Sequence, residues 1–368
     1  MLPPRLTNLD FARGIASLAI VLWHWQHFAF FGGYAPQGFA AESQPFFGVL
    51  KPFYSKTATV AVPFFFTLSG FVFFWLYLTK IADRTCQAKE FILYRFARLY
   101  PLHFATLCLV TVLQGIYFKS NGTWFVYRFN DLYHWLLNLF FISSWGPQTG
   151  QSFNGPVWSV SIEVGLYLLF FLFARFARAN LFTTLLIIIT CDYARRLRLH
   201  AIWPEAVECF FIGGLSFLMI DRYLNGKRHP SNELVLLVAT VVGWLSFLYW
   251  PEGRDVIDRW GLTFYLLLPG AIISLVVLET RGYRVSPKLA WVGDTTYATY
   301  LLHFPLQLVF ILVAQQLGTA ANLVYSKPAF LLFMTILFAI SVITYQYFEH
   351  PAQRLIRNYR HSTPRPAT

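Results

Sequence analysis

The sequence has 368 residues, of which 57% are apolar, 19% aromatic and only 12% charged. A soluble domain carries about 25% charged residues, so this chain has too little charge to cover a soluble surface, and its 39 Phe and 12 Trp exclude a disordered chain. The composition predicts a polytopic membrane protein, in which the net charge of +12 reports orientation and not nucleic-acid binding. The four cysteines show no paired spacing, so neither a disulfide framework nor a metal site is expected.

Ten segments approach the apolar length of about 20 residues that a membrane-spanning helix requires. They are 11–31, 58–78, 101–118, 157–174, 181–195, 205–221, 231–250, 260–279, 290–314 and 329–348. The aromatic-rich piece 132–145 is shorter, so we expect it to lie at the interface or to re-enter the membrane without crossing it. The predicted fold is all-α with about ten transmembrane helices.

The basic residues predict the orientation of these helices. With the N-terminus in the cytoplasm, eighteen Lys and Arg fall on the cytoplasmic side and ten outside. Positive residues prefer the cytoplasmic side, so both termini are predicted to be cytoplasmic, although the basic tract 195–198 lies outside. We expect one membrane domain over residues 1–354, followed by a basic cytoplasmic tail over 355–368.

Arg13 and His24 are ionisable residues in the first predicted span, where such residues mark function by default. They are 11 residues apart, which is three helical turns plus about 20°, so they share one face. Asp10 stands three residues before Arg13 and could pair with it. The alternatives are that Arg13 anchors the helix by snorkelling and that His24 makes a helix-packing hydrogen bond.

Glu163 is the one acid among 17 that we place well inside a span. It is predicted to lie about 9 Å below the outer end of the fourth span, close to the depth of about 10 Å predicted for His24. A carboxylate that orients an imidazole helps it to act as a base. Ser159 and Tyr167 stand four residues either side of Glu163 on the same face. The alternative is that Glu163 bonds to an unwound helix start nearby.

Ser69 and His303 lie near the middle of the second and ninth predicted spans. Ser69 precedes Gly70. The two small residues either allow close helix packing, or Ser69 is a nucleophile. Pro305 is expected to kink its helix, so His303 is either functional or a partner for the backbone groups that Pro305 frees.

Arg95 and Arg98 are three residues apart in the second predicted cytoplasmic loop and would share a helix face. Two guanidinium groups at this spacing can bind phosphate, or they can anchor the loop to anionic lipid. Glu349 begins a C-terminal run that adds a carboxylate and Arg354 at the same surface, which could equally be a salt bridge that ends a helix.

Six motifs, in one order, together resemble the bacterial acyltransferase-three family of integral membrane O-acyltransferases. They are residues 9–16 (LDFARGIA) followed by His24, 65–71 (FFTLSGF), 95–101 (RFARLYP), 158–163 (WSVSIE), 300–305 (YLLHFP) and 349–354 (EHPAQR). Val164 stands where the family usually has a second acid, and Leu302 where it usually has a Trp. The missing acid puts any mechanism that needs a carboxylate pair in doubt.

The resemblance implies a ten-helix enzyme of the bacterial inner membrane that moves an acyl group, most often acetyl from acetyl-CoA, onto a hydroxyl of an extracytoplasmic glycan. It implies that Arg13 and His24 are essential, that Arg95 and Arg98 form a basic pair, and that Glu163 belongs to the site. We expect acyl-CoA phosphates near the basic pair and Arg13. We expect Asp10, Ser69, Ser159, His303 and Glu349 to support the substrate or the structure.

Two chemical routes stay open from the sequence. His24 could act as a general base on the acceptor hydroxyl, or it could carry the acyl group covalently. A proton-coupled transporter or flippase of a sugar-containing substrate is the alternative from another class, because intramembrane Arg, His and Glu would also suit proton coupling. The absence of a repeat that relates the two halves disfavours it.

Overall fold

The computed structural model of the chain describes residues 2–30, 38–55, 57–177, 179–197, 199, 202–250 and 261–359. Within these ranges the regular structure is helical, without strands. The chain forms two compact units, each assembled from three segments. The first unit comprises Met1–Ile20, Ser55–Cys86 and Glu163–Gly293, and the second comprises Val21–Tyr54, Gln87–Ile162 and Asp294–Thr368.

Helices α1 (Thr7–His24) and α6 (Trp158–Phe176) each begin in one unit and end in the other. The other helices of the first unit are α3 (Thr57–Ala82), α7 (Leu181–Arg196), α8 (Ile202–Leu224), α9 (Pro230–Tyr249), the π-helix η4 (Thr263–Leu267), α11 (Leu268–Thr280), the 3-10 helix η5 (Pro287–Leu289) and α12 (Ala290–Asp294), which ends at the boundary.

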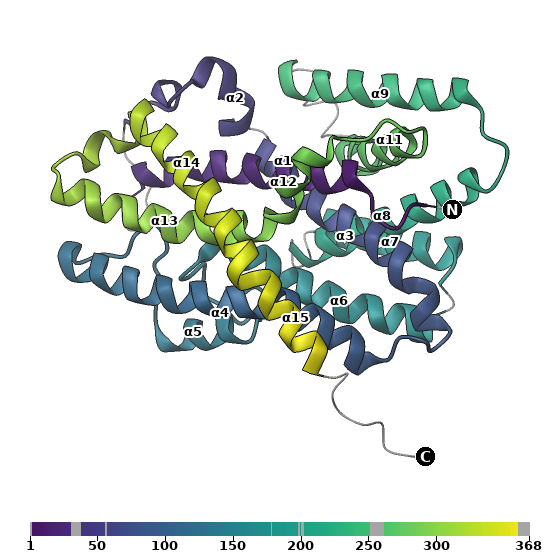
Figure 1. The fold of residues 1–368 in the computed structure, drawn as a ribbon, viewed down its shortest axis with the longest axis horizontal. Coiled ribbons are helices and arrows are strands. Elements are labelled where there is room, and N and C mark those ends of the chain that lie inside the picture. Colours follow the sequence, from purple (N-terminus) through teal and green to yellow (C-terminus); the bar gives the residue numbers. More distant parts are fainter. Residues whose placement is uncertain are drawn as a thin grey trace. The chain divides into compact units, whose positions relative to one another are not determined.

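The described part of the second unit contains three long helices, three helices of eight to ten residues and several single helical turns. Its elements are η1 (Trp25–Ala29), η2 (Ala41–Ser43), α2 (Phe47–Ser55), α4 (Ala88–Asn121), α5 (Leu132–Leu139), η3 (Gly155–Val157), α13 (Thr296–Gln316), η6 (Ala320–Tyr325), α14 (Lys327–Thr344), the π-helix η7 (Tyr345–Glu349) and α15 (His350–Tyr359). In Figure 1, α14 and α15 follow one another as one long yellow rod.

Eight helices in the described part of the chain are long and apolar enough to cross a membrane, which confirms the prediction of an all-α polytopic membrane protein. The predicted spans 11–31 and 181–195 form the shorter helices α1 and α7, of 18 and 16 residues. The piece 132–145 contains only the eight-residue helix α5, which is too short to cross.

Two of the sequence predictions need adjustment at the helix ends. The segment that carries Arg95 and Arg98, predicted as a loop, forms the first turns of the 34-residue helix α4. The predicted tail begins within α15, and residues 360–368 lie outside the described residues, as do 31 and 260 at the ends of two predicted spans.

The first unit is held together by a close crossing of α3 and α8. A Cβ atom on Gly70 would lie 1.7 Å from the carbonyl oxygen of Phe210, and one on Gly213 would lie 1.8 Å from that of Thr67. The absence of side chains at both glycines therefore lets the two backbones touch, as small residues do between membrane helices. Leu68 and Phe71 of α3 belong to the buried core beside this crossing.

The second unit packs α13 against α4 and α14. Its core is aromatic: Trp25 sits edge-on to Phe330 and Phe333, with ring centroids 5.0 and 5.5 Å apart. The indole nitrogen of Trp25 donates to the backbone oxygen of Val324 at 2.8 Å, which satisfies the only polar atom of that ring. This packing fixes the end of α1 and the start of η1, where the histidines of the candidate site lie.

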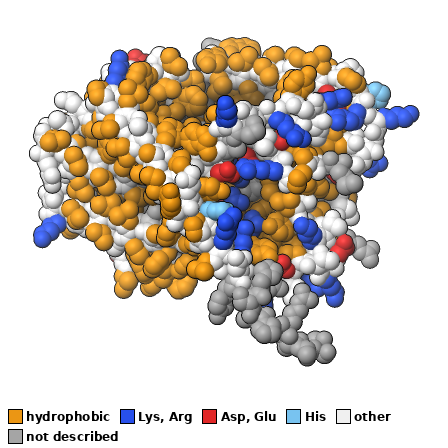
Figure 2. All heavy atoms as spheres, viewed as in Figure 1, with side chains coloured by type: hydrophobic (Ala, Val, Ile, Leu, Met, Phe, Trp, Pro, Cys, Tyr) orange, Lys and Arg blue, Asp and Glu red, His pale blue; other side chains and the backbone are white. Residues whose placement is uncertain are grey.

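Hydrophobic side chains cover much of the surface that Figure 2 displays, while Lys and Arg gather in clusters. On α9, Leu234, Val238, Val241 and Leu245 are each about half exposed or more. Exposed aliphatic side chains along a whole helix are costly in water but favourable in lipid, so these faces agree with the membrane interpretation.

Candidate functional site

Three histidines of the second unit form a stack at the end of α1. His24 lies beside His27, with ring centroids 4.5 Å apart, and beside His303 of α13, with centroids 5.0 Å apart and ring planes 6° from parallel. Nδ1 of His24 is 2.9 Å from Nε2 of His303. His303 and His27 are buried, whereas His24 keeps partial exposure. The sequence therefore predicted two members of this stack and missed His27.

The hydrogen bonds of the stack determine which nitrogen of each ring carries the proton. Nδ1 of His303 lies 2.6 Å from the backbone oxygen of Tyr300, which can only accept, so this nitrogen donates. In the neutral ring Nε2 of His303 then carries a lone pair and accepts from Nδ1–H of His24. The remaining nitrogen of His24, Nε2, is left with a lone pair. A partly exposed imidazole in this state can accept a proton or attack a carbonyl carbon.

His27 is fixed by a second set of bonds. Its Nδ1 donates to Oε1 of Gln307 at 3.0 Å, and Nε2 of Gln307 donates to the backbone oxygen of His24 at 2.7 Å. Gln307 stands one turn after His303 on α13, so one face of that helix holds both ends of the stack. Tyr127 completes the arrangement with its hydroxyl 3.5 Å from Nε2 of His27.

The backbone carbonyl that Pro305 frees is bonded by another segment. Pro305 lacks the N–H that would bond to the carbonyl of Leu301, four residues earlier. The side-chain amide of Asn154 donates to that carbonyl at 3.0 Å. The interpretation that His303 satisfies the freed group is therefore wrong for this carbonyl, because His303 bonds to Tyr300 instead.

Glu163 belongs to the first unit and has two hydroxyl partners there. Ser69 Oγ donates to its Oε1 at 2.9 Å, and Tyr167, one turn along α6, donates to the same oxygen. The prediction that Glu163 and Tyr167 share a helix face is confirmed. Ser69 bonds to Glu163, while the adjacent Gly70 makes the close contact with α8, so the two residues of the small pair have different roles. His24 lies in the second unit, and its pairing with Glu163 stays a prediction.

Ser159 was predicted on the face of Glu163 but bonds elsewhere, within the second unit. Its Oγ lies 2.8 Å from the hydroxyl of Tyr300, which itself donates to the backbone oxygen of Pro156. Ser159 therefore ties the start of α6 to α13 one turn before His303. It positions the helix that carries the stack.

Arg13 and Asp10 pair as predicted. The guanidinium of Arg13 lies 3.2 Å from Oδ1 of Asp10 and donates to the backbone oxygen of Gly293 at 3.0 Å. Oδ2 of Asp10 also accepts from Arg5 at 2.6 Å. Gly293 has no side chain, and a Cβ there would lie 2.7 Å from Asp10. These contacts tie α1 to α12 and favour an anchoring role for Arg13.

Arg95 and Arg98 lie on the first turns of α4, against which α15 packs. The guanidinium of Arg357 on α15 lies 5.5 Å from the ring centre of Tyr94 on α4. Glu349 is buried just before α15, where Gln353 donates to its Oε1 at 3.2 Å. The basic pair and the C-terminal run thus meet in one unit, as their predicted common surface implied.

The first unit also contains a buried acid that sequence reasoning missed. Glu208 of α8 is 1% exposed and bonds to Arg195 at 2.7 Å, while the hydroxyl of Tyr265 donates to its other oxygen. Arg195 and Arg196 both bond to Asp192 at 2.7 Å. Glu163 is therefore not the sole acid deep in an apolar helix. The basic tract that contradicted the orientation rule is neutralised locally, with Arg198 outside the described residues.

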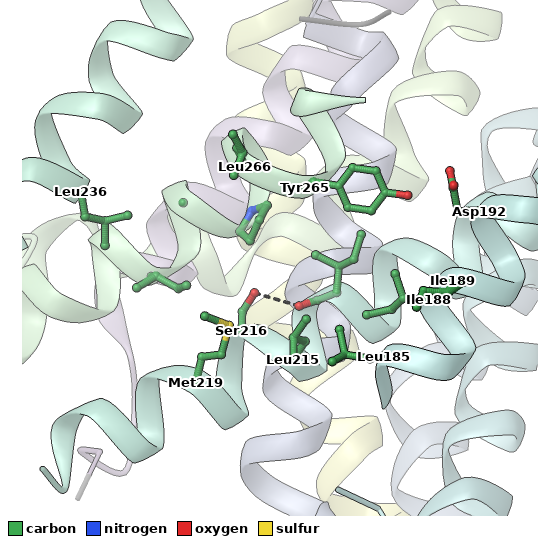
Figure 3. A pocket seen from close by; sticks show the side chains of 14 residues that line it. Leu185, Ile188, Ile189, Asp192, Leu215, Ser216, Met219, Leu236, Tyr265 and Leu266 are labelled. Carbon is green, nitrogen blue, oxygen red and sulfur yellow. Dashed lines mark hydrogen bonds between the residues drawn. The ribbon is translucent and has the colours of Figure 1, made fainter. Parts of the chain in front are cut away.

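A cavity of about 460 Å³ in the first unit borders this network. Its walls are apolar side chains of α7, α8, α9 and α11, and Figure 3 places Asp192 and Tyr265 together at one side of it. Ser216, which also lines it, donates to the backbone oxygen of Ile212 at 2.8 Å and so presents little polarity. The wall is therefore almost wholly hydrocarbon.

Comparison with known proteins identifies the class. A family model described as an acyltransferase domain matches residues 6–346, so the chain belongs to the acyltransferase-three family of membrane O-acyltransferases. It is 25% identical to the acyltransferase MdmB of Streptomyces mycarofaciens over 100% of this chain and 98% of that protein. No solved structure gives a significant match.

A second relative is the peptidoglycan O-acetyltransferase OatA of Listeria monocytogenes, which is 22% identical over 69% of this chain and 45% of its own length. Family membership makes the protein an O-acyltransferase embedded in a membrane through several helices. The transporter alternative loses its support, because the ionisable groups that suggested it belong to an acyltransferase.

Proposed function

We propose that this membrane O-acyltransferase moves an acyl group, in the first instance acetyl from acetyl-CoA, onto a hydroxyl of an extracytoplasmic or lipid-linked glycan such as exopolysaccharide or lipopolysaccharide. The name of the Listeria relative, a peptidoglycan O-acetyltransferase, supports both the acetyl group and a cell-envelope acceptor. The setting is the bacterial inner membrane, where acyl-CoA stays on the cytoplasmic side because its charged nucleotide cannot cross lipid.

The observation that carries the proposed chemistry is the lone pair on Nε2 of His24. Nε2 takes the proton from the acceptor hydroxyl while the hydroxyl oxygen attacks the thioester carbonyl. When the carbon–sulfur bond breaks, the same nitrogen returns the proton to the departing sulfur. His24 is the catalytic residue, and His303 is a positioning residue that accepts from Nδ1–H of His24 and stabilises the charge that forms, as the third group of a triad does.

Arg95 and Arg98 are proposed to bind the phosphates of acyl-CoA. Guanidinium groups suit phosphate because their planar N–H groups match its oxygens. The two side chains stand three residues apart, within one turn of α4, and α15 brings further cations to the same part of the second unit. Arg13, tied to Asp10 in the first unit, is proposed to support this site less directly, and Glu163 with Ser69 to support the acceptor.

The proposed function is tested by reconstituting the full chain in proteoliposomes with acetyl-CoA labelled in its acetyl group and a glycan acceptor. We expect label on the glycan with the natural protein. Glycan from cells with and without the gene should differ by the mass of the acyl group. Glycans of equal mass from both, together with no transfer in vitro, would contradict the proposal.

The basic pair has its own test with a matched control. Replacing Arg95 and Arg98 by Met should raise the KM for acetyl-CoA by about tenfold or more with little change in kcat, since each charged hydrogen bond contributes about 1.5–3 kcal/mol. Lys119→Met removes a cation from the other end of α4 and should leave KM unchanged. Equal effects of the two changes would argue against a phosphate site at Arg95 and Arg98.

A covalent route through His24 is the second candidate, because the same lone pair is nucleophilic. Rapid quenching during turnover separates the routes. An acyl group on His24 that forms and decays at the turnover rate supports the covalent relay, whereas direct base catalysis leaves His24 unmodified.

A further inference from the structure

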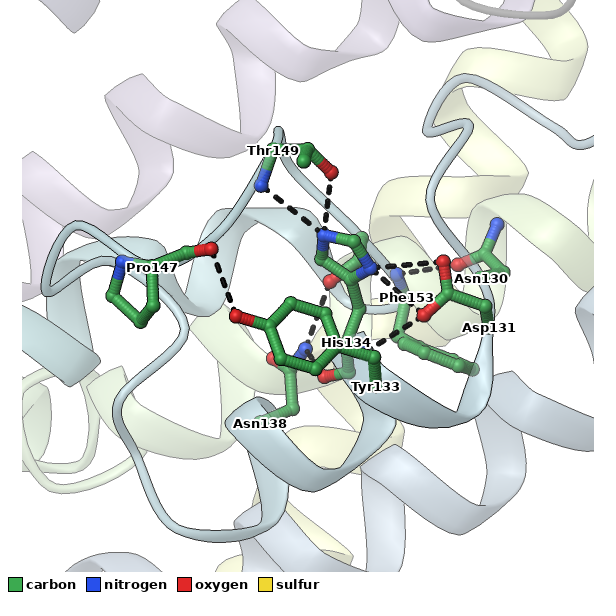
Figure 4. Close-up of polar contacts among 9 residues, drawn as sticks. Asn130, Asp131, Tyr133, His134, Asn138, Pro147, Thr149 and Phe153 are labelled. Atoms are coloured by element: carbon green, nitrogen blue, oxygen red, sulfur yellow. Dashed lines mark hydrogen bonds and ion pairs between the residues drawn. The ribbon is translucent and has the colours of Figure 1, made fainter.

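A second acid–base cluster lies in the second unit, outside the histidine stack. Asp131 caps the N-terminus of α5, where its Oδ1 accepts from the backbone N–H of His134 at 2.9 Å. The same carboxylate holds the imidazole of His134, with Nδ1 at 2.8 and 3.0 Å from its two oxygens. Thr149 comes from the loop before α6, and its Oγ1 lies 2.8 Å from Nε2 of His134 (Figure 4).

The direction of these bonds follows from what each atom can donate. An ionised carboxylate only accepts, so Nδ1 of His134 carries the proton and Nε2 carries the lone pair. The hydroxyl of Thr149 therefore donates to Nε2, and the backbone N–H of Thr149 donates to it at 3.3 Å as well. The backbone bond to His134 lowers the pKa of Asp131, which keeps the carboxylate ionised at neutral pH. Acid, imidazole and hydroxyl thus stand in the order that activates a nucleophile.

The exposure of the three side chains also suits a reactive hydroxyl. The imidazole of His134 is only 4% exposed, whereas Thr149 faces outward. Two further bonds hold the loop on either side of Thr149: the hydroxyl of Tyr133 donates to the backbone oxygen of Pro147, and Asn138 donates to Oγ of Ser152, each at 2.9 Å. Thr149 is therefore held in place and stays exposed as a residue.

This cluster is separate from the histidine stack. The stack rests on α13, and α4 lies between α13 and α5 in Figure 1. Asp131, His134 and Thr149 take no part in the chemistry proposed for His24. Asp131 also caps α5, but the bonds of Tyr133 and Asn138 already fasten the loop, so the bond between Thr149 and His134 adds a hydroxyl to the acid–imidazole pair in a segment that is held without it.

We propose that Asp131, His134 and Thr149 form a second acyl-transfer site, in which Thr149 takes up the acyl group as an ester and passes it to an acceptor hydroxyl. Oγ1 of Thr149 attacks the carbonyl carbon of an acyl thioester or ester, and its proton moves to Nε2 of His134. The bond to the leaving group breaks, and the leaving group takes that proton. An acceptor hydroxyl then attacks the Thr149 ester by the same steps in reverse.

As part of the overall reaction this site rests on the proposed function, but its reactivity can be tested alone. The full chain in detergent is incubated with 4-nitrophenyl acetate, quenched in acid and digested. The mass of the peptide that contains residue 149 is then measured by mass spectrometry. We expect one acetyl group on the hydroxyl of residue 149, both in the natural protein and in Thr149→Ser. We expect none in Thr149→Val, which has the same shape without the hydroxyl.

Dependence on the neighbours separates an activated hydroxyl from an accidentally labelled one. Asp131→Asn and His134→Gln should each slow the labelling of Thr149 by about tenfold or more, whereas His24→Ala should leave it unchanged. Absence of label in the natural protein, or labelling at an equal rate in His134→Gln, would overturn the proposal. Because the nitrophenyl ester replaces acetyl-CoA, labelling can succeed or fail independently of transfer from acetyl-CoA to glycan.

Discussion

The two units treat their buried polar groups differently. In the first, three acids in apolar helices are enclosed by donors: Glu163 by Ser69 and Tyr167, Glu208 by Arg195 and Tyr265, and Glu279 by the start of α1. In the second, the chain of bonds from Tyr300 through His303 ends at the lone pair of His24, a residue that keeps partial exposure. A network closed on itself stabilises a fold, whereas an open-ended one can exchange a proton with a substrate.

The largest expected effect comes from removing His24, at which the open network of the second unit ends. His24→Ala should lower acetyl transfer by about 10²–10⁴-fold, the usual contribution of a general base, and leave the amount of folded protein in the membrane unchanged. Transfer rate per folded molecule is the measurement. His103→Gln, which changes a buried histidine on α4 away from the stack, is the control. Near-normal transfer by His24→Ala would show that the open network of the second unit has no catalytic role.

The next effect breaks a closed network. Arg195→Met leaves the carboxylate of Glu208 buried without its cation, and should lower the free energy of unfolding by about 2–3 kcal/mol, less than a fully buried pair because Arg195 is partly exposed. Thermal unfolding in detergent measures it. Arg196→Met, which affects only the more exposed bond to Asp192, should unfold close to the natural protein. Equal unfolding of both variants would show that the enclosure of Glu208 contributes little.

A smaller effect is expected from the positioning residue of the open network. His303→Phe keeps a ring beside His24 but removes the acceptor for its Nδ1–H, and should lower kcat by about tenfold or more with little change in KM. His303→Gln retains an acceptor oxygen and should recover part of the loss. If both variants lost activity equally, shape and not proton placement would explain the role of His303.

The smallest effect concerns the start of α1. Both oxygens of Glu279 accept from the backbone N–H groups of Thr7 and Asn8, at 2.8 and 2.9 Å. Glu279→Gln removes the negative charge at a helix N-terminus and turns one of the two accepting oxygens into an NH2 group that cannot accept, and should lower the free energy of unfolding by about 1 kcal/mol or more. Thermal unfolding checks it, with the transfer rate per folded molecule expected to be unchanged. A stability equal to that of the natural protein would show that charge plays no part in this cap.

Composition and periodicity predicted the all-α membrane fold, because apolar length and scarce charge are properties of the chain itself. Individual contacts were predictable only where they are local. Asp10 with Arg13 and Glu163 with Tyr167 are three and four residues apart, so helix geometry sufficed. The position of α5 as a short helix followed from its length in the same way.

The partners that sequence reasoning missed are distant in the chain. Asn154 and Leu301 are 147 residues apart, and His24 and His303 are 279 apart. No periodicity connects such pairs, although a signal for part of the stack was present: His27 stands three residues after His24, and Gln307 four after His303. Glu208 was overlooked because it stands only three residues inside the predicted span 205–221, and its ion pair with Arg195 of another helix has no signal in the sequence.

The central claim is that His24 presents an unprotonated Nε2 because His303 accepts from its Nδ1–H. It is tested most directly by ¹⁵N magnetic resonance of protein labelled in the rings of its nine histidines, with the His24 signals assigned by their loss in His24→Gln. At neutral pH the account predicts a proton on Nδ1 of His24 and a non-protonated Nε2. A proton on Nε2 with a bare Nδ1 would contradict it.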